Sequence, residues 1–164
     1  MAKGFPQVQI MSRDAIEELS QKPFERKTAL ISITDADYDY AELNYQPAAL
    51  LQIAFDDVDN DIFEDEFERT PTDEERIRIA QKYHLLSDDQ AKEIADFFLS
   101  VVNDVEVIIC QCEHGQSRSA AVAAALLEYM THNGIQIFAD DLYFPNKVVF
   151  RKVYEALTPK NAKL

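Results

Sequence analysis

The stretch that decides the fold is Val105-Glu106-Val107-Ile108-Ile109-Cys110-Gln111-Cys112-Glu113-His114-Gly115-Gln116-Ser117-Arg118-Ser119. Its first half, Val105 to Gln111, is a β-branched apolar run typical of a strand covered on both faces. Small, helix-forming residues follow from Ser117 to Met130. The sequence therefore predicts a strand, a tight loop and a helix, a succession typical of a parallel α/β sheet.

The elements on either side alternate in the same way and predict a single domain over residues 1–164. Strands are expected at Gln7 to Met11, Thr28 to Thr34 and Leu50 to Phe55. Helices are expected after Ser12, with Ile16 and Leu19 on one face, at 73–83 and 88–102 behind the capping boxes Thr72/Glu75 and Ser87/Gln90, and at 146–157. The fold class is thus a three-layer α/β/α sandwich with a mostly parallel central sheet, whose ligands bind at the carboxyl ends of the strands.

The loop between Cys112 and Arg118 has the composition of an anion-binding turn. A tight turn from a strand into a helix points its backbone N–H groups inward, and the positive end of the helix dipole adds to their attraction for phosphate. Arg118 offers a planar guanidinium that pairs two phosphoryl oxygens and favours ionisation of the Cys112 thiol to a nucleophilic thiolate. Of the three glycines, Gly115 permits the turn, whereas Gly134 is expected after a helix with positive φ.

This stretch resembles the signature of the cysteine-based protein tyrosine phosphatases. The pattern C-x-x-G-x-x-R-S/T is matched at Cys112, Gly115, Arg118 and Ser119, within a C-x5-R loop. The resemblance is to the small dual-specificity-phosphatase-like branch and its prokaryotic-type tyrosine phosphatases. It implies that the cysteine forms a phosphocysteine intermediate and that the serine hydrogen-bonds the departing sulfur. We expect the cysteine to occupy a largely exposed loop position. The resemblance also implies that no metal or cofactor is required and that phosphate binds at Glu113, His114, Gly115, Gln116, Ser117 and Arg118.

Phosphatases of this kind need an upstream aspartic acid that protonates the leaving oxygen and then activates water. The strand Leu50 to Phe55 runs into Asp56 and Asp57, which resembles the family's arrangement of a strand and an acid loop. Strand alternation puts the two carboxylates on opposite sides. We assign the role to Asp57, which lies further onto the loop, and keep Asp56 as the competing candidate. Gln111 stands where the family usually has histidine, and its amide can hydrogen-bond the loop.

The charge balance excludes several classes of partner. The chain has 16 Lys+Arg against 30 Asp+Glu, a formal net charge of −14, which disfavours nucleic acid and anionic membranes. Two cysteines and the absence of a secretory leader or membrane span indicate a cytoplasmic protein with reduced thiols. The loop between Cys112 and Arg118 carries no lysine or arginine, so the expected substrate is a phosphorylated protein or small phosphomonoester, such as phosphotyrosine or another aryl phosphate, rather than a phosphoinositide.

Other interpretations of the same residues stay open. A catalytically weak or silent phosphate-binding module would keep Cys112 and Arg118 but lack a usable acid. A calcium-loop spacing occurs at Asp57, Asp59, Asp61 and Glu68, although Ile62 stands where the turn needs glycine. A zinc site would use Cys110, Cys112 and His114, for which no fourth ligand is near in the sequence. Three tyrosines after the second strand are candidates for the pocket rim or for packing: Tyr38, Tyr40 and Tyr45.

Overall fold

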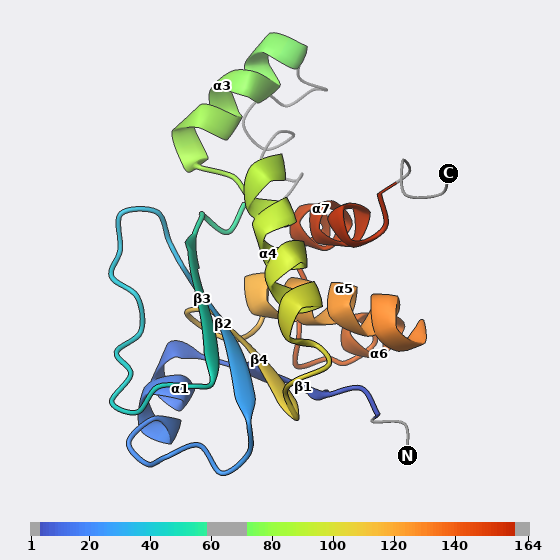
Figure 1. Ribbon diagram of the computed structural model, residues 1–164. Coiled ribbons are helices and arrows are strands. Elements are labelled where there is room, and N and C mark those ends of the chain that lie inside the picture. Colours follow the sequence, from blue (N-terminus) through green and yellow to red (C-terminus); the bar gives the residue numbers. More distant parts are fainter. Residues whose placement is uncertain (1–3, 59–71, 160–164) are drawn as a thin grey trace.

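A computed structural model describes residues 4–58 and 72–159, in which four parallel strands form the central sheet (Figure 1). The strands are β1 (Gln7–Met11), β2 (Thr28–Thr34), β3 (Ala49–Ala54) and β4 (Val107–Gln111), in the order β1-β4-β2-β3. The predicted strands are confirmed, with shifted ends for the third and fourth. Because all of these strands run in one direction, their carboxyl ends meet at one edge of the sheet, where Cys112 follows β4.

Helices cover both faces of this sheet, so the predicted three-layer sandwich is confirmed (Figure 1). One face carries α1 (Arg13–Leu19), and the other carries α4 (Asp88–Val101), α5 (Arg118–Thr131) and α7 (Lys147–Leu157), with α6 (Ile135–Phe138) beside α5. The remaining helix, α3 (Asp73–Tyr83), lies beyond the carboxyl edge of the sheet. No helix within the described ranges has the length and apolar character needed to cross a bilayer.

Strand β4 divides its side chains between two hydrophobic cores. Val107 and Ile109 face the small core under α1, whereas Ile108 and Cys110 face the larger core under α4, α5 and α7. This alternation continues to Cys112, which belongs to the larger core. The first turns of α5 consist mostly of small residues, which lets the helix pack closely there. Ser119–Ala125 are completely buried as a result. The side chain of Cys112 therefore lies against the first turn of α5.

Local signals placed most helix boundaries correctly. Both capping boxes form, from Thr72 to Glu75 and from Ser87 to Gln90, and each starts its helix as predicted. Ile16 and Leu19, expected on one face of α1, differ in burial: Ile16 is buried, whereas Leu19 is 41% exposed. Periodicity predicted the face of α1 but not how far the sheet covers it.

The expected positive φ at Gly134 was wrong. His132 takes the left-handed position that ends α5, with φ 57°, and Gly134 has φ −63°. Gly134 is needed for a different reason, since an added Cβ would lie 2.6 Å from the backbone oxygen of Ala124. The glycine lets the chain turn tightly against α5.

We expect Gly134→Ala to lower the free energy of unfolding by about 1–3 kcal/mol, because the new methyl group would overlap backbone rather than a movable side chain. Gly4→Ala is the matched control, since nothing lies within 4 Å of its Cβ, and we expect a change within about 0.5 kcal/mol. Urea denaturation of both variants measures the difference. Equal stabilities would contradict the close approach at Gly134.

Candidate active site

Cys112 is buried at the end of β4 rather than exposed on the loop, so the expected exposure was wrong. Its side chain is 2% exposed, and its backbone N–H donates to Met11 O at 3.2 Å, which extends the pairing of β4 with β1. The Sγ atom lies 3.1 Å from Ser119 Oγ, the hydroxyl predicted to contact it. The neighbouring thiol of Cys110 is completely buried, and this desolvation, with a smaller effect of Cys112, raises its pKa.

The backbone of the loop after Cys112 is turned so that its carbonyl oxygens point into the protein. Four of these oxygens accept hydrogen bonds. Cys112 O accepts from the side chain of the preceding residue, Gln111 Nε2 (3.0 Å). The other three accept from residues far away in the sequence: Glu113 O from Arg13 N (3.1 Å), Gln116 O from Phe144 N (2.8 Å) and Ser117 O from Asn146 N (3.3 Å). The N–H groups of residues 113–117 donate to no group in the described ranges. They are therefore available to an anion at the N-terminus of α5.

Gly115 gives the loop its shape. Its φ is +69°, and an added Cβ would lie 2.8 Å from both Met11 C and Ser12 N. The loop thus rests directly on the junction between β1 and α1. Both the left-handed conformation and the close approach require glycine, as the sequence predicted for the turn.

Arg118 lies almost entirely inside the site, with 4% of the residue exposed. Its Nη1 donates to Phe55 O at 2.8 Å and forms an ion pair with Asp35 Oδ1 at 2.6 Å. Its buried Nε has no hydrogen-bond partner among the described residues. The contacts of Nη1 therefore hold the guanidinium in place, while Nε remains an unsatisfied donor. A bound oxyanion can accept a hydrogen bond from Nε.

The two candidate acids lie differently, and Asp57 is the one that contacts the loop. Its Oδ1 accepts hydrogen bonds from Ser117 Oγ at 2.8 Å and Asn146 Nδ2 at 2.9 Å. Asp56 turns to the other side, where its Oδ1 accepts from the N–H of Ala36 at 3.1 Å. Strand alternation predicted this separation.

Asn146 ties the acid segment to α7. It is 2% exposed, and its Nδ2 donates both to Asp57 Oδ1 and to Val58 O at 2.9 Å. Its Oδ1 caps α7 by accepting from the N–H of Val149 at 3.1 Å. Asn146 was not predicted as a site residue, because no local pattern relates an asparagine before α7 to the loop after β3.

A second frame holds the opposite side of the loop. Arg13 Nε pairs with Glu113 Oε2 at 2.7 Å, while its Nη2 donates to Thr34 Oγ1 at 3.0 Å and to Asp39 O at 2.6 Å. Gln111 is buried and accepts a hydrogen bond from Ser32 Oγ while its own amide donates to the loop, as predicted for the residue in place of histidine. The loop is therefore anchored by α1, β2 and β4 together.

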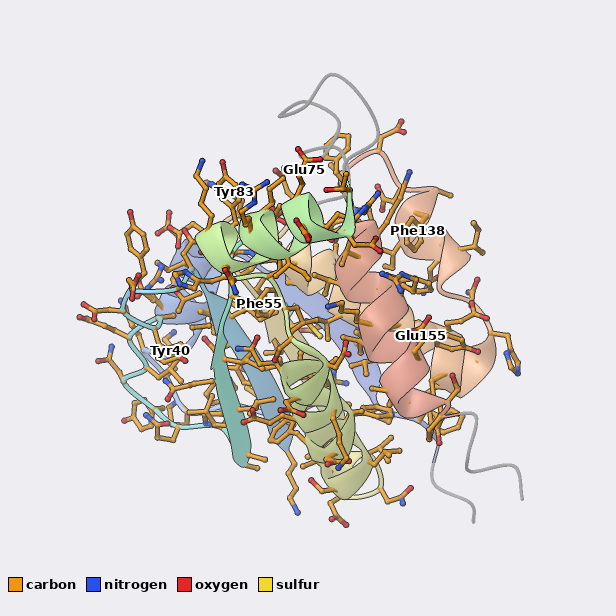
Figure 2. The ribbon with its side chains drawn as sticks, turned by 90° about the horizontal axis from the view of Figure 1, so that it is seen from above. Tyr40, Phe55, Glu75, Tyr83, Phe138 and Glu155 are labelled. Carbon is orange, nitrogen blue, oxygen red and sulfur yellow. The ribbon has the colours of Figure 1, made fainter. Side chains whose placement is uncertain are left out.

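Helix α3 returns to the site at its C-terminal end. His84 O accepts from the N–H of Asp56 at 3.0 Å, and His84 Nδ1 lies 3.7 Å from Asp56 Oδ2. This junction sets Tyr83 beside the end of β3, where Figure 2 shows it above Phe55. Tyr83 was not predicted as a site residue, because the sequence does not show where the inserted helix folds back.

A cavity of about 440 Å³ opens beside Arg118 and the two candidate acids, and the buried Cys112 is not among its lining residues. Its lining comes from the ends of β2 and β3, from α3 and from the loop: Asp35, Asp56, Asp57, Val58, Tyr83, Glu113, His114 and Arg118. Of the tyrosines in the described ranges, Tyr83 lines this cavity, whereas Tyr38 and Tyr45 are exposed outside it. Asp35 could have been anticipated, because it follows β2 at the same edge of the sheet as Cys112.

The metal interpretations receive no support from the part of the chain that the structure describes. There, no group of three or more His, Cys, Asp or Glu side chains is arranged to hold a metal ion, which includes Cys110, Cys112 and His114. Asp59, Asp61, Ile62 and Glu68 of the calcium-like spacing lie outside the described residues.

The fold is that of the cysteine-based protein tyrosine phosphatases, in the compact form of the dual-specificity enzymes. Human DUSP28 is 14% identical, with a TM-score of 0.53 over 97% of this chain and 96% of its own. DUSP15 is 17% identical, with a TM-score of 0.51 over 99% and 90%, and Tk-PTP in its active form is 16% identical, with a TM-score of 0.50 over 98% and 99%. No protein-family model and no curated protein matches the sequence. At these identities the likeness shows the fold.

We expect Asn146→Asp to destabilise the protein by about 1–3 kcal/mol, because a carboxylate can keep the cap of α7 but cannot donate to Asp57 or Val58. The added change Asp57→Asn should recover part of the loss by restoring a donor and removing the like charge. Chemical denaturation of the single and double variants tests the coupling. Additive losses would contradict the contact between Asp57 and Asn146.

Proposed function

We propose that the protein is a phosphatase that hydrolyses phosphate monoesters through a phosphocysteine intermediate. The observation that carries this proposal is the buried, unpartnered Nε of Arg118 beside a loop whose five N–H groups are unpaired among the described residues. A buried cationic donor without a partner is costly unless a ligand satisfies it. A phosphoryl group fits, because its three oxygens accept from the guanidinium and from the N–H groups together.

The first step transfers the phosphoryl group to Cys112. The Sγ thiolate attacks phosphorus in line with the leaving oxygen, so that an S–P bond forms as the P–O bond of the ester breaks. Asp57 donates its proton to the leaving oxygen. Because Oδ1 of Asp57 already accepts two hydrogen bonds, from Ser117 and Asn146, the transferable proton belongs on Oδ2.

The second step releases phosphate and restores both groups. Asp57, now a carboxylate, accepts a proton from water, and the water oxygen attacks phosphorus as the S–P bond breaks. The departing thiolate of Cys112 accepts a hydrogen bond from Ser119 Oγ, which lies 3.1 Å from the sulfur. Arg118 and the N–H groups of the loop bind the equatorial oxygens through both steps.

The expected substrate class is an aryl phosphate such as phosphotyrosine. Tyr83 and Val58 supply apolar surface to the wall of the cavity above Arg118. No lysine is among the residues that line the cavity within the described ranges, so further phosphate groups on a substrate would find no cation of their own. A single phosphoryl group on an aromatic ring matches both features.

Cys112→Ser should abolish turnover of 4-nitrophenyl phosphate but retain binding of inorganic phosphate, because Arg118 and the loop N–H groups remain. Steady-state kinetics and calorimetric titration measure the two properties, and thermal unfolding confirms that the variant is folded. Wild-type turnover by Cys112→Ser would contradict the mechanism. Phosphate binding by the wild-type protein without any turnover would instead favour the silent phosphate-binding module.

Asp57→Asn should lower kcat for poor leaving groups by about 10²–10⁴-fold, which is the usual contribution of a general acid. Asp56→Asn is the matched control, since its Oδ1 still accepts from Ala36. The reverse pattern, with the loss in Asp56→Asn, would assign the acid to Asp56.

A further inference from the structure

Carboxylates dominate the mouth of the cavity above Arg118. Four of its eight lining residues are acidic: Asp35, Asp56, Asp57 and Glu113. The lining contains one guanidinium, that of the buried Arg118. Glu113 is paired with Arg13 and Asp35 with Arg118. Asp56 and Asp57 have no lysine or arginine partner among the described residues, so the lining keeps an excess of negative charge.

The acidic surface continues along the segment after β2. This segment reads Asp35-Ala36-Asp37-Tyr38-Asp39-Tyr40, and Asp37, Tyr38 and Asp39 are exposed. It is fixed to the site, because Asp39 O accepts from Arg13 Nη2 at 2.6 Å and the same arginine holds Glu113 of the loop. Tyr38, which lies between these two residues in the sequence, is 69% exposed. We call residues 35–40 the acidic wall, and Figure 2 shows its end at Tyr40.

The position of a substrate relative to the acidic wall follows from Arg118. Its buried, unpartnered Nε marks where the phosphoryl group binds, and Asp35 of the wall touches the same guanidinium. Asp35 is also one of the residues that line the cavity, so a phosphorylated chain that leaves the cavity over Asp35 passes residues 36–40. Carboxylates attract Lys and Arg and repel Asp and Glu, and an exposed tyrosine ring also attracts a cation.

We propose that the acidic wall selects phosphotyrosyl segments that carry Lys or Arg beside the phosphorylated residue. This inference rests on the proposed function and adds a substrate preference to it. The phosphoryl group is bound by Arg118 and the loop, and the basic neighbours are bound by Asp37, Tyr38 and Asp39. A phosphotyrosyl segment flanked by Asp or Glu would be repelled by the carboxylates of the acidic wall.

Binding to folded Cys112→Ser protein tests the preference without turnover. Two fluorescent phosphotyrosyl peptides of equal length are compared, one flanked by lysines and the other by glutamates. We expect the lysine peptide to bind at least about tenfold more tightly at low ionic strength, and the difference to shrink at high salt because exposed charges are screened. Equal binding, or tighter binding of the glutamate peptide, would overturn the inference.

Charge-neutral variants in the Cys112→Ser background locate the effect. Asp37→Asn/Asp39→Asn should reduce the preference at least about threefold, since the changes remove two charges and asparagine tolerates the positive φ of residue 37. The matched control Glu18→Gln/Asp104→Asn removes two exposed charges at the opposite edge of the sheet and should keep the preference. A preference lost equally in both would show a net-charge effect and overturn the role of the wall.

Turnover of 4-nitrophenyl phosphate by the wild-type protein and by Asp37→Asn/Asp39→Asn tests the proposed phosphatase activity independently of the proposed peptide preference. We expect equal rates, because this small substrate does not reach the wall. Turnover with no peptide preference overturns the inference alone. Peptide preference without turnover keeps the wall as a binding surface and contradicts the phosphatase proposal.

Discussion

The site depends on how four carbonyl oxygens of the loop after β4 are held: those of Glu113, Gln116 and Ser117 accept hydrogen bonds from donors far away in the sequence, and that of Cys112 accepts from the adjacent residue. Backbone groups of α1 and of the segment before α7, together with the amide of Gln111, supply these donors. The N–H groups of residues 113–117 meanwhile donate to no group in the described ranges, which leaves them available to an anion. Gly115 is the residue that lets the loop rest on the β1–α1 junction in this conformation. The proposed anion site would therefore be built into the packing of the fold.

The buried guanidinium of Arg118 connects this loop to the acidic surface around it. A buried charge is stable only when it is paired, and here Asp35 and Phe55 O provide the pairing on one nitrogen. The same carboxylate begins the acidic wall, so Asp35 both pairs with the buried guanidinium and contributes to the negative charge beside the cavity. In the proposed function, phosphate binding and the choice of neighbouring residues would share Asp35.

Local patterns predicted the parts of this protein that depend on near neighbours in the sequence. The strand before Cys112, the capping boxes at Thr72 and Ser87 and the glycine turn at 115 are of this kind. The contacts of Arg118 with Asp35 and of Asp57 with Asn146 join segments far apart in the chain, and no local pattern encodes them. The burial of Cys112 was missed for the same reason, because it depends on how closely α5 packs over the end of β4.

The central claim is that Cys112 carries the phosphoryl group during turnover. Rapid mixing of the wild-type protein with an aryl phosphate, acid quenching and peptide mass analysis would measure this directly. The account predicts a transient increase of one phosphoryl group on the peptide that contains Cys112, formed no later than the first turnover and lost as substrate is exhausted. Turnover with no such adduct, or with the phosphoryl group on another residue, would contradict it.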